Sequence, residues 1–360
     1  MSDAVGVRRA RRVAVAAVLA LVIAVLTLSW AKWLPYAAKT RALAGTGVWP
    51  GSDILRVGEV HPGDPPSWSA AWSFTRAYAS AIWPALVAAL LISAALQTLV
   101  PRAWLLRVLN RPSRLGAALA GAAASTPSMM CTCCTAPVAV GLRRRGAGIA
   151  AVVAYWLGNP LLNPAVLVFL LFVAPWQWTV TRLAVGAVVV IGGACVVSLV
   201  ADRGVPASAV PASAVPAPAA PAADPDPSAA GFGRALVRLL VTLVPEYALV
   251  VMLVGGFRGW LFPLGQGGLG TGVAVVLVAA TVGTLMVIPT GGEIPIAQGA
   301  AVAGLSLGAV GALLITLPAV SLPGIAMVGR AFGWRVTAAA AGVTAAGGLL
   351  GAAVLALLPG

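Results

Sequence analysis

The chain has 360 residues, of which 60% are hydrophobic and only 9% are charged. Because a water-soluble globular chain carries about 25% charged residues, this composition excludes a soluble protein. The formal net charge of +14 does not indicate nucleic-acid binding, because the basic residues lie at the ends of apolar runs, where they set membrane topology. We therefore expect an all-α polytopic membrane protein with the lipid bilayer as its partner and no nucleic acid.

The N-terminal segment over 1–34 combines Arg8, Arg9, Arg11 and Arg12 with an uncharged run over 13–31. A signal peptide begins in the same way, but this run reaches the roughly 17–25 residues that span a bilayer. We expect an uncleaved first transmembrane helix in a cell inner (plasma) membrane, with its N-terminus in the cytoplasm. The polar segment over 35–76 is expected to be an extracytoplasmic loop.

Six further apolar runs are long enough to cross the membrane, over 77–100, 146–174, 179–201, 234–260, 304–329 and 336–358. Two more stretches, 115–142 and 271–303, are interrupted by Gly, Pro and Thr. If both return to the side from which they enter, 16 of the 23 Lys and Arg residues lie inside, whereas single crossings divide them almost equally. The positive-inside rule therefore predicts about seven full transmembrane helices plus two re-entrant or broken hairpins.

A Pro- and Ala-rich segment over 202–233 separates two membrane halves, 77–201 and 234–360. It contains two copies of Val-Pro-Ala-Ser-Ala and no sustained apolar periodicity. This composition predicts a cytoplasmic linker without a core of its own.

The two interrupted stretches align without a gap when the chain is shifted by 158 residues. Several Thr, Pro, Ala and Gly positions then coincide, with Thr132, Pro137 and Pro160 falling on Thr290, Pro295 and Pro318. Because three crossings separate the copies, they would have opposite orientations, and an inverted repeat with paired breaks is the usual build of secondary transporters. Backbone groups freed at a break must face protein or a water-filled cavity, so the paired breaks predict a substrate site near the midplane.

The string Pro-Ser-Met-Met-Cys-Thr-Cys-Cys-Thr-Ala-Pro is the most specific one in the chain, and it contains Cys131, Cys133 and Cys134. Soft sulfur atoms suit a soft metal or metalloid ion, and Cys131 and Cys133 form the natural chelating pair. Cysteine also packs well as a small apolar residue, and we accept that explanation for the isolated Cys195. For the cluster we expect substrate binding.

Five other polar residues in apolar surroundings are candidates. Asn159 and Asn163 each precede a proline, and such steps either line a polar path or produce only a kink. Thr290, in the second interrupted stretch, is expected to contribute to the same substrate site. Intramembrane carboxylates are costly and usually face a pathway, which predicts proton coupling through Glu293 and Glu246; a structural pair with an arginine is the alternative.

The cysteine pair, Pro137, Gly141, Gly146 and the two Asn-Pro steps together resemble the predicted-permease family that contains the ArsP organoarsenical exporters. The later Glu-Ile-Pro over 293–295 and Leu-Pro over 317–318 resemble that family's second half, so the likeness covers 80–200 and 234–335. It implies efflux of trivalent, thiol-reactive organoarsenicals. The family pattern has a cysteine pair followed by a small residue, and Cys134 departs from it.

These observations predict a secondary permease, and not an enzyme, that exports a small thiol-reactive or soft metal or metalloid solute by proton coupling. No G-x4-G-K-[ST] nucleotide-binding motif is present, and with one histidine no haem is expected, so we expect no cofactor. The alternative is a membrane thiol–disulfide electron carrier. Such a carrier would place a cysteine in each half, whereas Pro289 and Gly291 align with Cys131 and Cys133. A homo-oligomer is compatible with either function.

Overall fold

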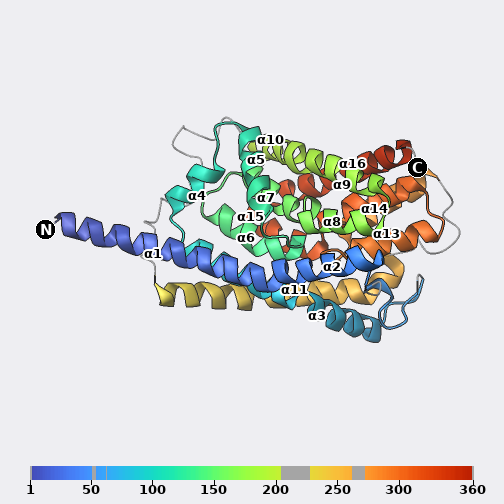
Figure 1. The fold of residues 1–360 in the computed structure, drawn as a ribbon, viewed down its shortest axis with the longest axis horizontal. Helices are drawn as coiled ribbons and strands as arrows, with labels where there is room; N and C mark the ends of the chain where they lie inside the picture. The colour runs from blue at the N-terminus through green and yellow to red at the C-terminus, as the bar shows by residue number, and fades with distance from the viewer. Residues whose placement is uncertain (1, 51–53, 62, 204–227, 262–271, 359–360) are drawn as a thin grey trace.

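The computed structural model describes residues 2–50, 54–61, 63–203, 228–261 and 272–358 (Figure 1). This part of the chain forms helices and connections without a strand. Six continuous helical segments in it are long and apolar enough to span a membrane, and one helix pair, bent by 52°, makes a seventh. The predicted polytopic all-α fold is confirmed.

The N-terminal span joins α1 (Ser2–Leu28), the π-helix η1 (Ser29–Trp33) and α2 (Leu34–Thr46). A short 3-10 turn, η2 (Ile54–Arg56), precedes the first half. The first half consists of α3 (Trp68–Thr98), α4 (Arg102–Leu109), α5 (Arg114–Ser125), α6 (Thr132–Arg144), α7 (Ile149–Leu161), α8 (Pro164–Val173), α9 (Trp176–Ala187), the π-helix η3 (Val188–Gly193) and α10 (Ala194–Arg203). The second half consists of α11 (Ala229–Leu261), α12 (Val273–Leu285), α13 (Glu293–Val302), α14 (Leu307–Ala319), α15 (Leu322–Phe332) and α16 (Trp334–Leu357).

The predicted loop over 35–76 is shorter in the structure. The first span continues through η1 and α2 to Thr46, and it ends at Gly47, whose φ of +65° suits glycine at a helix C-terminus. The helix α3 begins at Trp68 because the Ser67 side chain accepts a hydrogen bond from the backbone N–H of Ala70. Most of the predicted linker over 202–233 lies outside the described residues, since α10 ends at Arg203 and α11 begins at Ala229.

The first interrupted stretch forms a hairpin of α5 and α6. These helices have 12 and 13 residues, so each is about 20 Å long and too short for a bilayer core of about 30 Å. Asn110, before α5, donates from Nδ2 to the carbonyl of Gly146 (3.2 Å) and accepts from the N–H of Gly148 (2.8 Å), both after α6. The chain therefore leaves the hairpin at the end where it entered.

The second interrupted stretch forms a hairpin of α12 and α13, which have 13 and 10 residues. Gly308, at the start of α14, packs against Val276 in the first turn of α12, so this hairpin also closes on itself. Gln298 of α13 donates to the carbonyl of Val173 at the end of α8 (2.7 Å). In Figure 1, α4 lies above the middle of α1, toward the left end of the bundle, and α13 lies at the right end, on the side where the chain ends. The two hairpins therefore enter the bundle from opposite ends.

Helix starts recur at the shift of 158 residues that aligns the two interrupted stretches. Three helices of the first half, α7, α8 and α9, begin at Ile149, Pro164 and Trp176, and α14, α15 and α16 begin at Leu307, Leu322 and Trp334. The break between α7 and α8 therefore corresponds to the bend between α14 and α15.

Small residues allow the helices around these breaks to pack closely. A Cβ atom at Gly121 of α5 would lie 2.0 Å from the carbonyl oxygen of Ala151 in α7. A Cβ atom at Gly311 of α14 would lie 2.4 Å from the carbonyl oxygen of Gly351 in α16. Such approaches of one backbone to another are typical of membrane helix interfaces.

We predict that Arg12→Cys and Arg144→Cys become labelled by a membrane-impermeant maleimide from one side, and Val48→Cys from the other. All three positions are exposed, and the hairpin geometry places position 144 at the end where α1 begins. The measurement is labelling of intact cells and of inverted vesicles. The unmodified chain is the control, because three of its four cysteines are buried. Labelling of positions 144 and 48 from the same side would contradict the re-entrant hairpin.

Candidate functional site

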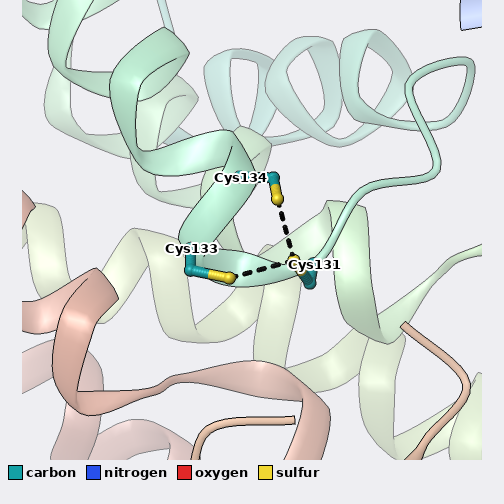
Figure 2. Close-up of side chains that lie close together, drawn as sticks. All are labelled: Cys131, Cys133 and Cys134. Atoms are coloured by element: carbon teal, nitrogen blue, oxygen red, sulfur yellow. Dashed lines mark hydrogen bonds between the residues drawn. The ribbon is translucent and has the colours of Figure 1, made fainter. Parts of the chain in front are cut away.

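Three thiols converge at the start of α6 (Figure 2). Cys131 is the N-cap residue of α6, and Cys133 and Cys134 lie in its first turn. The Sγ atom of Cys131 lies 3.0 Å from that of Cys133 and 3.2 Å from that of Cys134. All three side chains are buried and free of disulfides. The sequence-predicted chelating pair is therefore brought together, and Cys134 joins it.

Asn159 holds the loop that leads into the thiols. Its Oδ1 accepts hydrogen bonds from the Ser128 hydroxyl and from the backbone N–H of Met130 (3.3 Å). Its Nδ2 donates to the carbonyl of Tyr155 one turn earlier (2.9 Å). Within this loop Met129 adopts a φ of +48°, a conformation that is uncommon for residues other than glycine and often occurs at functional sites. Asn159 therefore holds the backbone of the loop that precedes Cys131.

Two tyrosines that the sequence analysis missed contact Cys133. The hydroxyl of Tyr78 in α3 lies 3.3 Å from its Sγ, and the hydroxyl of Tyr247 in α11 lies 3.2 Å from it. Both aromatic rings are buried, and their centroids are 6.2 Å apart. Because α3 and α11 belong to different halves, Cys133 lies where the two halves meet.

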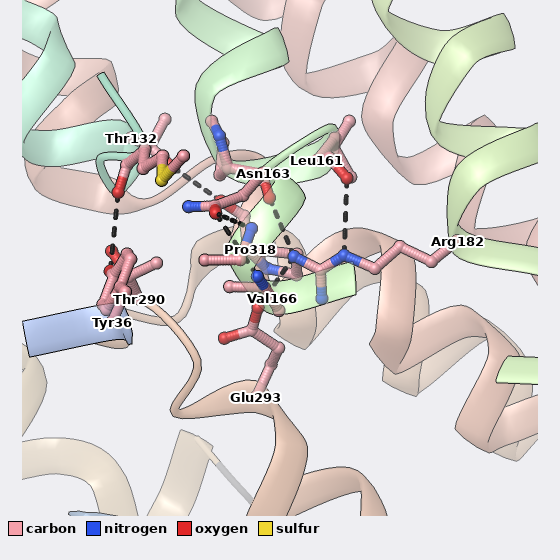
Figure 3. Close-up of polar contacts among 12 residues, drawn as sticks. Tyr36, Thr132, Leu161, Asn163, Val166, Arg182, Thr290, Glu293 and Pro318 are labelled. Carbon is pink, nitrogen blue, oxygen red and sulfur yellow. Dashed lines mark hydrogen bonds and ion pairs between the residues drawn. The ribbon is translucent and has the colours of Figure 1, made fainter. Parts of the chain in front are cut away.

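Thr132 connects the thiol segment to the second half (Figure 3). Its hydroxyl donates to the carbonyl of Pro318 near the end of α14 (2.7 Å), and its own carbonyl accepts from Nε1 of the buried Trp156 (3.0 Å). The last four carbonyls of a helix lack partners within the helix. Thr132 therefore satisfies one such carbonyl at the α14–α15 bend.

A cavity of about 380 Å³ lies beside the thiols and contains Cys131 in its wall. The two hairpin tips meet there, because Thr290 of the second interrupted stretch lines the same cavity. Lys32 of η1 also lines it, and its Nζ donates to the hydroxyls of Tyr36 (3.0 Å) and Thr290 (3.4 Å). Lys32 directly follows the uncharged run over 13–31, and the sequence analysis did not identify it as a site residue.

Glu293 and Arg182 form an ion pair inside the bundle, with 2.8 Å between Oε1 and the guanidinium. Their side chains are 2% and 0% exposed. Arg182 also donates to the carbonyls of Pro160 (2.8 Å) and Leu161 (3.4 Å) at the end of α7 (Figure 3). Glu293, in the first turn of α13, does not line the thiol cavity.

Two other predicted site residues, Asn163 and Glu246, have partners outside the thiol cluster. Asn163 caps α8, because its Oδ1 accepts from the backbone N–H groups of Ala165 (3.1 Å) and Val166 (3.3 Å). Glu246 pairs with Arg330 at 3.2 Å, and the Arg330 side chain is 70% exposed. Glu246 is partly buried, with a 20% exposed side chain, and it does not line the thiol cavity.

The thiol cluster has the geometry of a site for a soft ion. Its three Sγ atoms lie within 4.8 Å of one another. Thiolates around a tetrahedral Zn²⁺ bind at about 2.3 Å, which places neighbouring sulfur atoms about 3.8 Å apart. Small side-chain rotations would therefore bring the three sulfur atoms around one soft metal or metalloid centre.

We predict that Arg182→Met lowers the thermal stability of the detergent-solubilised protein strongly. Removing one partner of a buried ion pair leaves an uncompensated charge, which costs about 3–5 kcal/mol. The double variant Arg182→Met/Glu293→Leu should recover most of the loss. Arg330→Met, which removes one partner of the exposed pair, is the matched control and should change the melting temperature little. Equal losses of melting temperature in Arg182→Met and Arg330→Met would contradict the larger cost predicted for breaking the buried pair.

Comparisons with known proteins agree with this architecture. A family model described as a predicted permease matches residues 67–357. The UPF0718 protein YraQ of Escherichia coli (strain K12) is 38% identical over 309 residues, and the match covers 84% of each chain. No solved structure matches the chain. The resemblance that rested on the cysteine string and the Asn-Pro steps is confirmed, and the chain belongs to the predicted-permease family.

Proposed function

We propose that the protein is a secondary permease that binds a small thiol-reactive or soft metalloid solute through Cys131, Cys133 and Cys134. The observation that carries this proposal is the convergence of three buried Sγ atoms beside a cavity. A packing role for cysteine does not require three sulfur atoms to face one another, whereas chelation of a soft centre does.

The arrangement of the two halves supports a protein that transports the solute rather than one that only binds it. Helix starts recur at a shift of 158 residues, and the two hairpins enter from opposite ends. We interpret this as an inverted repeat, in which the halves alternately open the site to each side. The cavity is lined by residues from both hairpins, as such a mechanism requires.

The family resemblance suggests a trivalent organoarsenical as the solute and export as the direction. Trivalent arsenic is a soft centre. An arsenical oxide with one carbon substituent condenses with two thiols and releases one water, and the cluster offers Cys131 and Cys133 as this pair, with Cys134 beside them. The proposed orientation, with the N-terminus in the cytoplasm of the inner membrane, follows from the excess of basic residues on that side.

The proposed coupling ion is the proton, with Glu293 as the main carrier and Glu246 as a second one. Glu293 is buried, and its Oε1 contacts Arg182, which in turn contacts the end of α7. Protonation of Glu293 would remove one charge of this pair and release α13 from α9. A change of proton occupancy would thus act on the packing between the halves.

Substitution of the thiols tests the binding site. We predict that Cys131→Ser and Cys133→Ser each reduce transport of phenylarsine oxide by at least about tenfold, because each removes a soft ligand worth more than about 1.4 kcal/mol. Cys134→Ser should also weaken transport if three thiols bind. The measurement is uptake into inverted vesicles. Cys195→Ser is the matched control, and equal transport by all four variants would contradict the proposed site.

Substitution of the carboxylates tests the coupling. Because Glu293→Gln alone leaves Arg182 unpaired, we use Arg182→Gln/Glu293→Gln, which removes both charges together. We predict that this variant still moves solute down its gradient but no longer responds to an imposed pH gradient. Glu246→Gln is measured in parallel. Unchanged pH dependence in both variants would contradict coupling through these two carboxylates. No response of the unmodified protein to the pH gradient would identify a facilitator that follows the solute gradient.

A thiol–disulfide electron carrier is the second candidate, because the Sγ atoms of Cys131 and Cys133 are only 3.0 Å apart. The corresponding tip of the second hairpin, Pro289–Gly291, has no cysteine with which to exchange electrons. Alkylation, which labels free thiols, distinguishes the two functions. A carrier would have disulfide-bonded Cys131 and Cys133 in part of its molecules in the cell and after mild oxidation. A permease would keep both thiols free and open to alkylation during transport.

A further inference from the structure

Lys32 is a charged residue buried in the middle of a membrane span. It lies in the π-helix η1, within the continuous span Arg11–Thr46, and its side chain is 6% exposed. Isolated turns of π-helix frequently occur at functional sites, and a charge at this depth is costly unless it serves a function. Lys32 also lies outside the matched range 67–357, so it belongs to the part of the chain that precedes the family's common region.

Lys32 has polar partners but no carboxylate partner among the described residues. Its ammonium contacts the hydroxyls of Tyr36 and Thr290 and lies 5.0 Å from the centroid of the Tyr36 ring. The carboxylates that form ion pairs in the described part of the chain pair with other residues. Two hydroxyls satisfy donors, but they do not balance a positive charge in an apolar environment.

The cavity beside Lys32 combines this charge with a thiol. Among the described residues that line it, Lys32 is the one with a formal charge, and Cys131 is the one with a thiol. Thr290 adds a hydroxyl, and the aromatic side chains of Trp30, Tyr36 and Trp83 form part of the wall. An aromatic ring would pack well against these side chains.

We propose that the cavity selects solutes that carry an anionic oxygen group in addition to their thiol-reactive atom. Lys32 and Thr290 contact the anionic group, and Cys131 contacts the reactive atom. An anionic group would supply the negative charge that is missing beside Lys32. A charge-assisted hydrogen bond in an apolar site is strong. This inference rests on the proposed function, because it specifies the solute class of the same site.

A matched pair of solutes tests the inference. Phenylarsine oxide is neutral, and its 4-carboxy derivative differs by one carboxylate. We expect proteoliposomes with the unmodified protein to prefer the carboxylate. Lys32→Gln should reduce transport of the 4-carboxy compound about tenfold or more, because a hydrogen bond to a charged group is lost, and should change transport of the neutral compound much less. Lys32→Arg, which keeps the charge, should retain the preference.

Two further variants separate recognition from folding. Thr290→Val keeps the shape of the side chain and should reduce the preference for the carboxylate in the same direction as Lys32→Gln. Lys39→Gln is the matched control on the same span, because Lys39 packs over the Trp49 ring at 3.3 Å and does not line the cavity. Thermal stability of each variant is measured alongside transport, and Lys32→Arg and Thr290→Val test the proposal should Lys32→Gln fail to fold.

The outcomes distinguish this inference from the proposed function. If Lys32→Gln lowers transport of both compounds equally, the charge acts on the protein's own thiols, and the proposal that the cavity selects anionic solutes is wrong. If it changes neither, Lys32 has no part in recognition. If Cys133→Ser transports both compounds normally, or if the unmodified protein transports neither, the proposed function fails together with the inference.

Discussion

Backbone groups that leave a helix inside a membrane have no water to bind, so every break in this bundle must find its partners in the protein. The carbonyl of Pro160 at the end of α7 accepts from Arg182, and the carbonyl of Pro318 at the end of α14 accepts from Thr132. These two prolines are 158 residues apart. Each carbonyl is satisfied by a side chain from another segment, so the breaks join the helices that surround the site. The thiol segment is joined to the second of these breaks because Thr132 belongs to it.

The two carboxylates of the second half show how position decides the role of a charge. Glu246 and Glu293 both pair with an arginine, but only Glu293 is fully buried with its partner. A surface pair contributes about 0–1 kcal/mol, whereas loss of one buried partner costs several times more. Proton uptake by Glu293 would therefore have a structural consequence that proton uptake by Glu246 lacks. On the proposed function, this difference makes Glu293 the stronger candidate for coupling, whereas the sequence indicated both residues by their apolar surroundings.

Much of the fold follows from the sequence because apolar length specifies membrane spans directly. The seven spans lie close to the predicted runs, and the broken segments form the hairpins that the basic residues indicated. The contacts around the site were less predictable. Lys32 follows the uncharged run over 13–31, and nothing in that run indicates the π-helix that contains Lys32 or the cavity that it lines. Tyr78 and Tyr247 lie inside long apolar helices, and no local pattern indicates that both reach Cys133. Arg182 was not singled out from the sequence, because its carboxylate partner is more than a hundred residues away.

The site draws on three parts of the chain that, on the proposed function, move relative to one another during transport. Cys131 comes from the first hairpin, Thr290 from the second, and Lys32 from the N-terminal span. A solute that contacts all three would hold them together, so its binding free energy would favour the closed arrangement over any arrangement that separates them. A solute that contacts Cys131 alone would bind without this effect. On the proposed function, a second contact group on the solute therefore determines both which compounds bind and which of them drive the conformational change.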